Sequence, residues 1–317
     1  MTTTATPASS SIGQSGGKRP LPPQVPRDGG GEDSYEDAFD ASLFLNEEYV
    51  SVSVPFGEVE EEGEGRERFS LDLLCSQAAS TDFDLTGQVL WPAAALLAGY
   101  LVAGEEGGTG EKSRGRSLAA RSRSGACELG AGLGLSGLAA VAFSGLRRLV
   151  LTDGSDVVLR VLERNARRVA TSSCSAEAEE REREVSVSGL EWGDEAAAAA
   201  LRREHSMNGF DLLLGADVTY SHSALPALFS TAAMLLRERE EDEDEEDEDE
   251  EERKKEKEKP PVPTFLLGYV SRSLALDRAV PREAEKAGFD VEVVAGTRRR
   301  LPGGQEGWIL CLTKKKN

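Results

Sequence analysis

From residue 125 onward, short apolar runs alternate with longer segments in which apolar residues recur at helical spacing. The runs predict strands over residues 125–129, 148–152, 184–190, 210–216 and 264–270. The longer segments predict helices over residues 133–143, 156–169, 224–236 and 278–287. Strands that alternate with helices in this order indicate a parallel sheet covered by helices on both faces, which is an α/β fold.

Two pairs of segments fall outside this alternation. Near the C-terminus, residues 289–294 and 307–312 are predicted strands with no room for a helix between them, so we expect them to pair antiparallel. Near the N-terminus, residues 47–55 and 66–74 alternate polar and apolar positions around an acidic, glycine-containing stretch. That pattern predicts an N-terminal β-hairpin in addition to the main sheet.

Polar low-complexity segments mark the limits of the folded domain. Residues 1–44 are rich in Ser, Thr, Pro and Gly and then acidic, which predicts a disordered tail. Residues 45–317 are expected to form one domain, with a buried helix over 90–102 that begins near a Trp-Pro pair. Two insertions interrupt this domain: residues 104–124, predicted to be a surface loop, and an acidic run at 238–259.

The formal net charge of −20 comes almost entirely from the polar segments. Residues 1–70 carry a net charge of −9 and residues 238–259 one of −10, which leaves about −1 for the rest of the chain. Nucleic-acid binding needs a basic face, and the sequence shows none, so we expect no nucleic-acid partner. The most apolar stretch, residues 90–103, is shorter than the about 20 residues of a membrane-spanning helix, so we expect no membrane partner.

The few cysteines and histidines indicate a reducing compartment and no metal site. Four cysteines are scattered without a CxxC pair, and two histidines stand far apart. We therefore expect a cytoplasmic protein, with a nuclear location also open. Separately, we expect it to be monomeric. The first 27 residues lack acids and are rich in Ser and Thr; a disordered tail is favoured there, and an organelle transit peptide is the alternative.

The run Cys127-Glu128-Leu129-Gly130-Ala131-Gly132-Leu133-Gly134 carries the strongest functional signal. Glycines between a strand and a helix let the chain turn sharply and let a ligand approach the backbone closely. Two registers fit. A dinucleotide-type GxGxxG over residues 132–137 would place Glu128 inside a buried strand, whereas a GxGxG register ends the strand at Glu128-Leu129 and places the acid at the lip of a pocket. We favour the second register, because an acid at the lip suits a ligand with cationic groups. S-adenosyl-L-methionine (SAM), with its ammonium and sulfonium, is such a ligand.

Later strand ends add residues suited to a nucleoside. Asp153 follows the strand at 148–152, where its carboxylate would accept two hydrogen bonds from a ribose diol; the alternative is an N-cap for the next helix. Trp192 follows the third strand and would pack on an adenine ring, or else be a partly buried loop residue.

The end of the strand at 210–216 provides the candidate catalytic residues. Ala216 is small and would leave the cofactor face open, while Asp217 and Tyr220 would project into the crevice and hold an amine nucleophile. The alternative is a helix-capping Asp beside a packing Tyr. Trp91, at the start of the helix over 90–102, fits core packing as well as it fits a site.

Together these segments resemble a known family. The elements in order are Val89-Leu90-Trp91-Pro92-Ala93-Ala94, the glycine run, Leu151-Thr152-Asp153, Glu191-Trp192-Gly193 and Gly215-Ala216-Asp217-Val218-Thr219-Tyr220. They resemble the seven-β-strand protein methyltransferases of methyltransferase family 16, the methyltransferase-like 21 group, which includes enzymes that methylate lysines of non-histone proteins. The resemblance covers residues 45–313 apart from the two insertions.

The resemblance implies a Rossmann-like seven-stranded sheet, parallel with an antiparallel last strand, and SAM as cofactor. It implies that Gly130, Ala131, Gly132 and Gly134 line the methionine part of SAM, with Glu128 beside them. Asp153 would take the ribose hydroxyls, Trp192 would lie beside the adenine, and Trp91 and Ala216 would border the cofactor. Asp217 and Tyr220 would form the catalytic pair. Cys127 and Leu133 depart from the family's usual residues, in ways the fold should tolerate.

The expected activity is therefore methyl transfer from SAM to a protein side chain, with a lysine ε-amine favoured. Three alternatives stay open: a methyltransferase for arginine, histidine or a small molecule; a SAM-binding protein without turnover; and, more distantly, a nicotinamide-dependent oxidoreductase.

Overall fold

The computed structural model describes residues 49–56, 69–76, 83–103, 112–171, 183–239 and 261–316. Strands and helices alternate along most of this length. In chain order they are β1 (Tyr49–Phe56), β2 (Phe69–Ser76), the 3-10 helix η2 (Phe83–Gln88), α1 (Pro92–Val102), α2 (Lys112–Arg121), β3 (Ala126–Leu129), α3 (Leu135–Phe143), β4 (Arg148–Asp153), α4 (Asp156–Thr171), β5 (Glu184–Gly189), α5 (Glu195–His205), β6 (Leu212–Ala216), α6 (Leu225–Leu235), β7 (Thr264–Val270), α8 (Leu274–Lys286), β8 (Phe289–Val293), β9 (Arg299–Arg300) and β10 (Glu306–Lys314).

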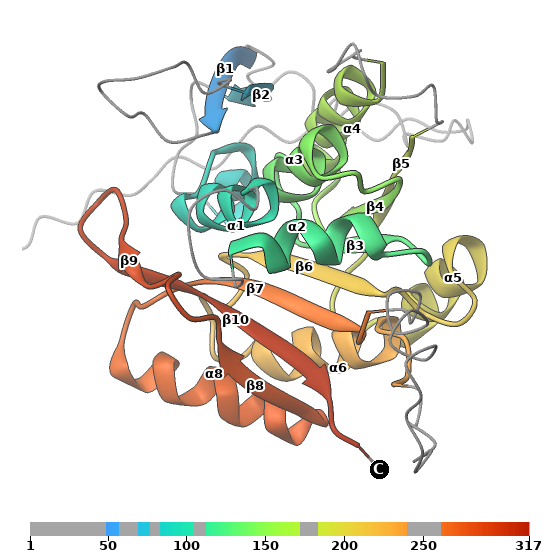
Figure 1. Cartoon of the computed structure of the whole chain (residues 1–317), viewed down its shortest axis with the longest axis vertical. Helices are drawn as coiled ribbons and strands as arrows, with labels where there is room; N and C mark the ends of the chain where they lie inside the picture. The colour runs from blue at the N-terminus through green and yellow to red at the C-terminus, as the bar shows by residue number, and fades with distance from the viewer. Residues whose placement is uncertain are drawn as a thin grey trace, which may run out of the picture. The chain divides into compact units, whose positions relative to one another are not determined.

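The main sheet has the order β5-β4-β3-β6-β7-β10-β8, with the short β9 beside β10 (Figure 1). Strands β3 to β7 pair in parallel. Strand β10 runs antiparallel to both β7 and β8. The predicted α/β fold with an antiparallel last strand is thus confirmed. Because β3 lies between β4 and β6, the strand order reverses there, and a crevice is expected at the carboxyl ends of these strands.

The sheet separates two hydrophobic cores. Helices α1, α3 and α4 cover one face and α5, α6 and α8 the other (Figure 1). Successive strand residues point to opposite faces, so in β3 Ala126 joins the core under α3, whereas Cys127 and Leu129 join the core under α6. Glu128 therefore shares the face of Ala126, and this placement decides its environment.

The predicted N-terminal hairpin is confirmed. β1 pairs antiparallel with β2, from Tyr49 opposite Ser76 to Phe56 opposite Phe69. Asn165 of α4 connects it to the domain, because its side chain accepts a hydrogen bond from Leu74 N at 2.7 Å and donates to Leu74 O and to Leu133 O. Leu133 belongs to the glycine run, so the fully buried Asn165 side chain links the hairpin to the loop predicted to bind the cofactor.

The prediction of a surface loop over residues 104–124 is wrong where the structure describes it. Helix α2 occupies Lys112–Arg121 and packs on α1. A Cβ at Gly115 would lie 2.6 Å from the Tyr100 ring, and Ala119 is fully buried. The helix was missed because it packs through small residues, which leave no periodic pattern of large apolar side chains.

Two other helices differ from expectation. Helix α5 was not predicted; it is alanine-rich and begins after Asp194, whose carboxylate caps it by accepting from Ala197 N at 2.9 Å. Helix α8 starts at Leu274 rather than at residue 278, after the N-cap Ser273. Predictions for residues 1–44 and for 240–259 lie outside the described residues. Within the described residues, no helix combines the length and apolarity needed to cross a membrane.

Candidate active site

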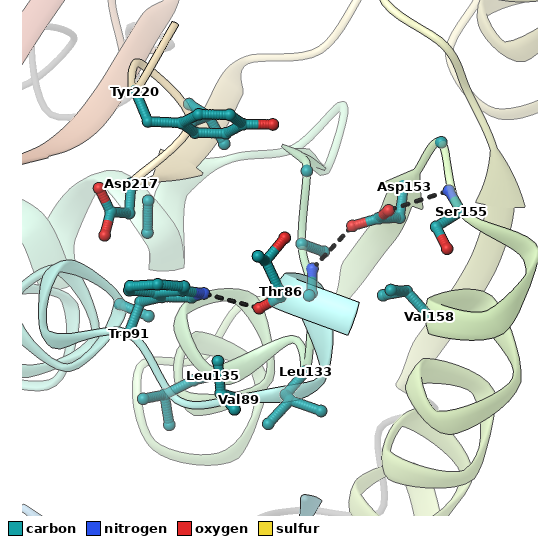
Figure 2. A pocket seen from close by; sticks show the side chains of 18 of the residues that line it. Thr86, Val89, Trp91, Leu133, Leu135, Asp153, Ser155, Val158, Asp217 and Tyr220 are labelled. Carbon is teal, nitrogen blue, oxygen red and sulfur yellow. Dashed lines mark hydrogen bonds between the residues drawn. The ribbon is translucent and has the colours of Figure 1, made fainter. Parts of the chain in front are cut away.

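A cavity of about 450 Å³ opens at the carboxyl ends of β3, β4 and β6, a size typical of small-molecule sites (Figure 2). Helix η2 and the start of α1 form its floor and one wall. The loops after β3, β4, β5 and β6 form the rest. Its lining includes nine residues predicted for the site: Trp91, Gly130, Ala131, Gly132, Asp153, Trp192, Ala216, Asp217 and Tyr220.

The glycine loop packs too closely against neighbouring residues to carry side chains at Gly130 and Gly132. Gly130 and Gly132 have φ values of 61° and 55°, in the left-handed region that favours glycine. A Cβ at Gly130 would lie 2.9 Å from the Trp192 ring, and one at Gly132 would lie 3.0 Å from Gly87 O. The cavity wall therefore tolerates no side chain at either position.

Gly134 does not border the cavity, contrary to the prediction. It has a φ of 81° and is the N-cap residue of α3. A Cβ there would lie 2.8 Å from Leu162 of α4, so this glycine allows the loop to pass close to that helix.

Glu128 is not at the lip of the pocket, and that prediction is wrong. It is 1% exposed and does not line the cavity. Its Oε2 accepts a hydrogen bond from Gly137 N at 2.9 Å, so it joins β3 to α3 beneath the glycine loop. Burial raises its pKa from 4.5 to about 7, although hydrogen bonds from Gly137 and Ser136 oppose the change. The strand does end at Leu129, as the favoured register placed it, but the acid is buried as the rival register implied.

Asp153 projects from the end of β4 into the cavity (Figure 2). Its Oδ2 accepts from Gly132 N at 3.0 Å and its Oδ1 from Ser155 N at 3.1 Å. A carboxylate has about four lone-pair sites, so these backbone donors leave acceptor capacity for a hydroxyl donor. Helix α4 begins at Asp156, so the residue before it is Ser155 and Asp153 is not its N-cap. Burial raises the pKa of Asp153, and the backbone donors counteract this.

Asp217 lies at the opposite end of the cavity, directly after β6 (Figure 2). It has a φ of 58°, which is uncommon for a residue other than glycine. Its N–H donates to Gly268 O at 3.0 Å, which holds this conformation against β7. Its side chain is 6% exposed, and Arg272 Nη2 donates to both carboxylate oxygens, at 2.6 and 2.7 Å.

Tyr220 forms the outer wall, with its ring lying across the cavity in Figure 2. It is 45% exposed. Its pKa is raised by partial burial and by the negative charges of Asp153 and Asp217, so the phenol stays protonated at neutral pH.

The two tryptophans predicted for the site, Trp91 and Trp192, both line the cavity. Trp91 is the N-cap residue of α1, and its Nε1 donates to Thr86 O at 2.8 Å (Figure 2). Trp192 lies against Gly130. That Trp192 lies beside the adenine of SAM and that Trp91 borders the cofactor stay predictions.

Arg272 and the η2 residues Thr86 and Gly87 line or contact the site but were not predicted from the sequence. Arg272 follows β7, the neighbour of β6, so the rule that located Asp217 could have located it. Helix η2 carries no such signal, because its place on the cavity floor depends on tertiary packing against α4.

The residues of the cavity fit SAM. A loop without side chains at Gly130 and Gly132, which line the cavity, suits close approach of a ligand, and a carboxylate with spare acceptor capacity suits a ribose diol. Aromatic side chains and a second carboxylate surround the far end, where cationic groups are favoured.

Comparison with known families agrees with this geometry. The model of a family described as lysine methyltransferase matches residues 75–241, more than half of the chain. The chain belongs to this family. It is a SAM-dependent methyltransferase, with the fold and cofactor that the sequence predicted. No curated protein sequence matches it.

Solved structures with a similar fold include several methyltransferases. Magnesium protoporphyrin IX methyltransferase from Synechocystis PCC 6803, solved with bound SAM, is 11% identical, with coverage of 72% of this chain and 99% of that one and a TM-score of 0.39. A methyltransferase from Pyrococcus furiosus is 13% identical, covering 60% and 75%, with a TM-score of 0.39. The putative methyltransferase SMU.776, complexed with S-adenosylhomocysteine (SAH), is 10% identical, with coverage of 76% of this chain and 53% of that one and a TM-score of 0.43.

Proposed function

We propose that this methyltransferase acts on the ε-amine of a lysine in a non-histone protein. The observation that carries the proposal is the environment of Asp217: a nearly buried carboxylate beside the rings of Trp91 and Tyr220 at one end of the cavity. Asp217 and the Trp91 ring hold the guanidinium of Arg272 in the structure, and a carboxylate beside aromatic rings favours a cationic side chain over a phosphate or a carboxylate. The family description, lysine methyltransferase, supports the same substrate type.

The chain's residues divide the work between two ends of the cavity. Asp153 and the glycine loop would hold the nucleoside and methionine parts of SAM, which, when bound, supplies an activated methyl group. At the other end Asp217 would orient the incoming amine and Tyr220 would limit its movement. A free lysine has a pKa of about 10.4 and must lose a proton before it can attack. A partly desolvated pocket lowers that pKa, so we assign most of the rate to desolvation and positioning.

A protein, rather than a free metabolite, is the proposed substrate because the methyl-accepting end opens to the surface at Tyr220, which is 45% exposed. We further propose that the enzyme acts as a monomer in the cytoplasm, without nucleic-acid or membrane partners.

The test is transfer from isotopically labelled SAM into a cell lysate, followed by mass-spectrometric mapping of the labelled residue. We expect label on lysine, and its loss in Asp217→Asn while SAM binding by calorimetry is retained. Label on arginine, histidine or a small molecule would move the enzyme to another specificity. SAM binding without any transfer would indicate a binding protein, and binding of NAD in place of SAM would point to an oxidoreductase. Full transfer by Asp217→Ala would remove Asp217 from the mechanism.

A further inference from the structure

Asp217, the carboxylate proposed to bind the substrate amine, already forms an ion pair with Arg272. Arg272 Nη2 contacts both oxygens of Asp217, at 2.6 and 2.7 Å. The same guanidinium lies over the Trp91 ring, with its Cζ 5.7 Å from the ring centroid. A carboxylate and an aromatic face that hold one cation together form a subsite for a cationic side chain.

The form of the contact indicates that it can be exchanged. A single nitrogen of Arg272 bridges both carboxylate oxygens, whereas a guanidinium that fixes a carboxylate firmly uses two parallel donors. The Arg272 side chain is 30% exposed, and the residue lies between the end of β7 and the N-cap Ser273 of α8. Because the Arg272 side chain is partly exposed to solvent, it can move away from Asp217, and a second cation can then compete for the carboxylate.

We propose that Arg272 occupies the subsite of the substrate's cationic side chain, and that this side chain binds by displacing Arg272 from Asp217. This inference rests on the proposed function, because it takes the group that replaces Arg272 to be the ammonium of a lysine side chain. Arg272 is then a specificity-determining residue. A partner protein that makes further contacts with the surface can displace it, whereas a free amine in solution competes poorly.

The size of the effect follows from the fraction of molecules in which the subsite is open. If the Arg272–Asp217 contact is formed in nine molecules out of ten, the apparent affinity for an external cation falls about tenfold. Removing Arg272 should restore that affinity. A purely supporting role predicts the opposite, since loss of Arg272 would then misplace Asp217 and weaken binding.

The experiment uses n-butylammonium chloride as the probe, titrated into the full-length protein with bound S-adenosylhomocysteine at constant ionic strength. Binding is followed through the indole ¹H–¹⁵N signal of Trp91, assigned with Trp91→Phe among the three tryptophans. We expect Arg272→Met and Arg272→Gln to bind the probe about tenfold more tightly than the wild type, and Arg272→Met/Asp217→Asn to lose binding. Two arginine variants are used so that a folding defect in one, detected as loss of S-adenosylhomocysteine binding, leaves the other to decide.

Arg298 provides a matched control variant. Its guanidinium lies 4.3 Å from the Trp308 ring centroid and 3.8 Å from Glu306, a similar arrangement away from the cavity. Arg298→Met should leave probe affinity unchanged, and the neutral 1-butanol should not bind the tighter variants. Equal or weaker binding of n-butylammonium by the Arg272 variants overturns the proposal, even if lysine labelling in a lysate succeeds. Tighter binding without lysine labelling would keep the subsite and reject the proposed substrate.

Discussion

Replacement of Glu128 by Gln should stabilise this protein, and increasingly so as the pH rises. Glu128 is a buried acid of β3 whose Oε2 accepts a hydrogen bond from Gly137 N at 2.9 Å. Gln has nearly the same shape, and its amide oxygen can accept that bond without carrying a charge. The substitution therefore removes the cost of burying a charge and keeps the link between β3 and α3.

The magnitude follows from the proton affinity of the carboxyl group. Its pKa is 4.5 when exposed and about 7 in the folded protein. Below pH 4.5 the group is protonated in both states and folding does not depend on it. Between these values the folded state binds the proton more tightly, so wild-type stability falls as pH rises. Above pH 7 the loss is complete, and since one pKa unit equals about 1.4 kcal/mol, it amounts to about 3 kcal/mol.

The assay is urea denaturation of the wild type and Glu128→Gln between pH 4.5 and 8.5. Titrating groups distant from residue 128 act equally on both proteins, so the difference in unfolding free energy isolates residue 128 and its interactions with Asp153 and Cys127. We expect a difference within about 1 kcal/mol at pH 4.5, growing to about 3 kcal/mol in favour of Gln at pH 8. A difference that does not change with pH, or a Gln variant that is less stable at pH 8, would refute the reasoning from burial.

Three further predictions test the cofactor site and the packing around it. Asp153→Asn should weaken SAM binding about 10- to 100-fold in calorimetry with unchanged circular dichroism, because it removes the charged acceptor; unchanged affinity would exclude Asp153 from the cofactor site. Gly130→Ala should lower the melting temperature and abolish SAM binding, since its Cβ would meet Trp192 at 2.9 Å. Gly296→Ala, also at positive φ but with nothing within 4 Å, should show only the backbone cost of about 1 kcal/mol, and equal losses in the two variants would contradict the crowding argument. Cys127, whose pKa burial raises, should resist iodoacetamide until urea is added, as judged by peptide mass spectrometry.

The periodicity of apolar residues was sufficient for most of the fold. Strand β7 occupies the predicted residues, Thr264–Val270, and the hairpin and closing strands pair as expected. It was also sufficient for most of the cavity. Residues that follow parallel strands meet at one edge of the sheet, so Asp153 and Asp217 could be brought together from their positions in the chain alone.

Packing between elements distant in sequence could not be predicted in this way. Helix α2 was missed because it contacts α1 through Gly115 and Ala119, which have no periodic bulk. The strand-end rule could have placed Arg272 at the same edge of the sheet as Asp217, but the ion pair between these two side chains depends on how they pack in the folded protein.

Glu128 shows the limit most clearly. The sequence by itself determined that an acid precedes the glycine loop and that the strand ends beside it. Which face of the sheet the side chain occupies depends on the pleat, and what covers that face depends on where α3 packs. Only the tertiary structure could therefore decide that this acid lies buried against α3, while Asp153 and Asp217 remain to face the ligand.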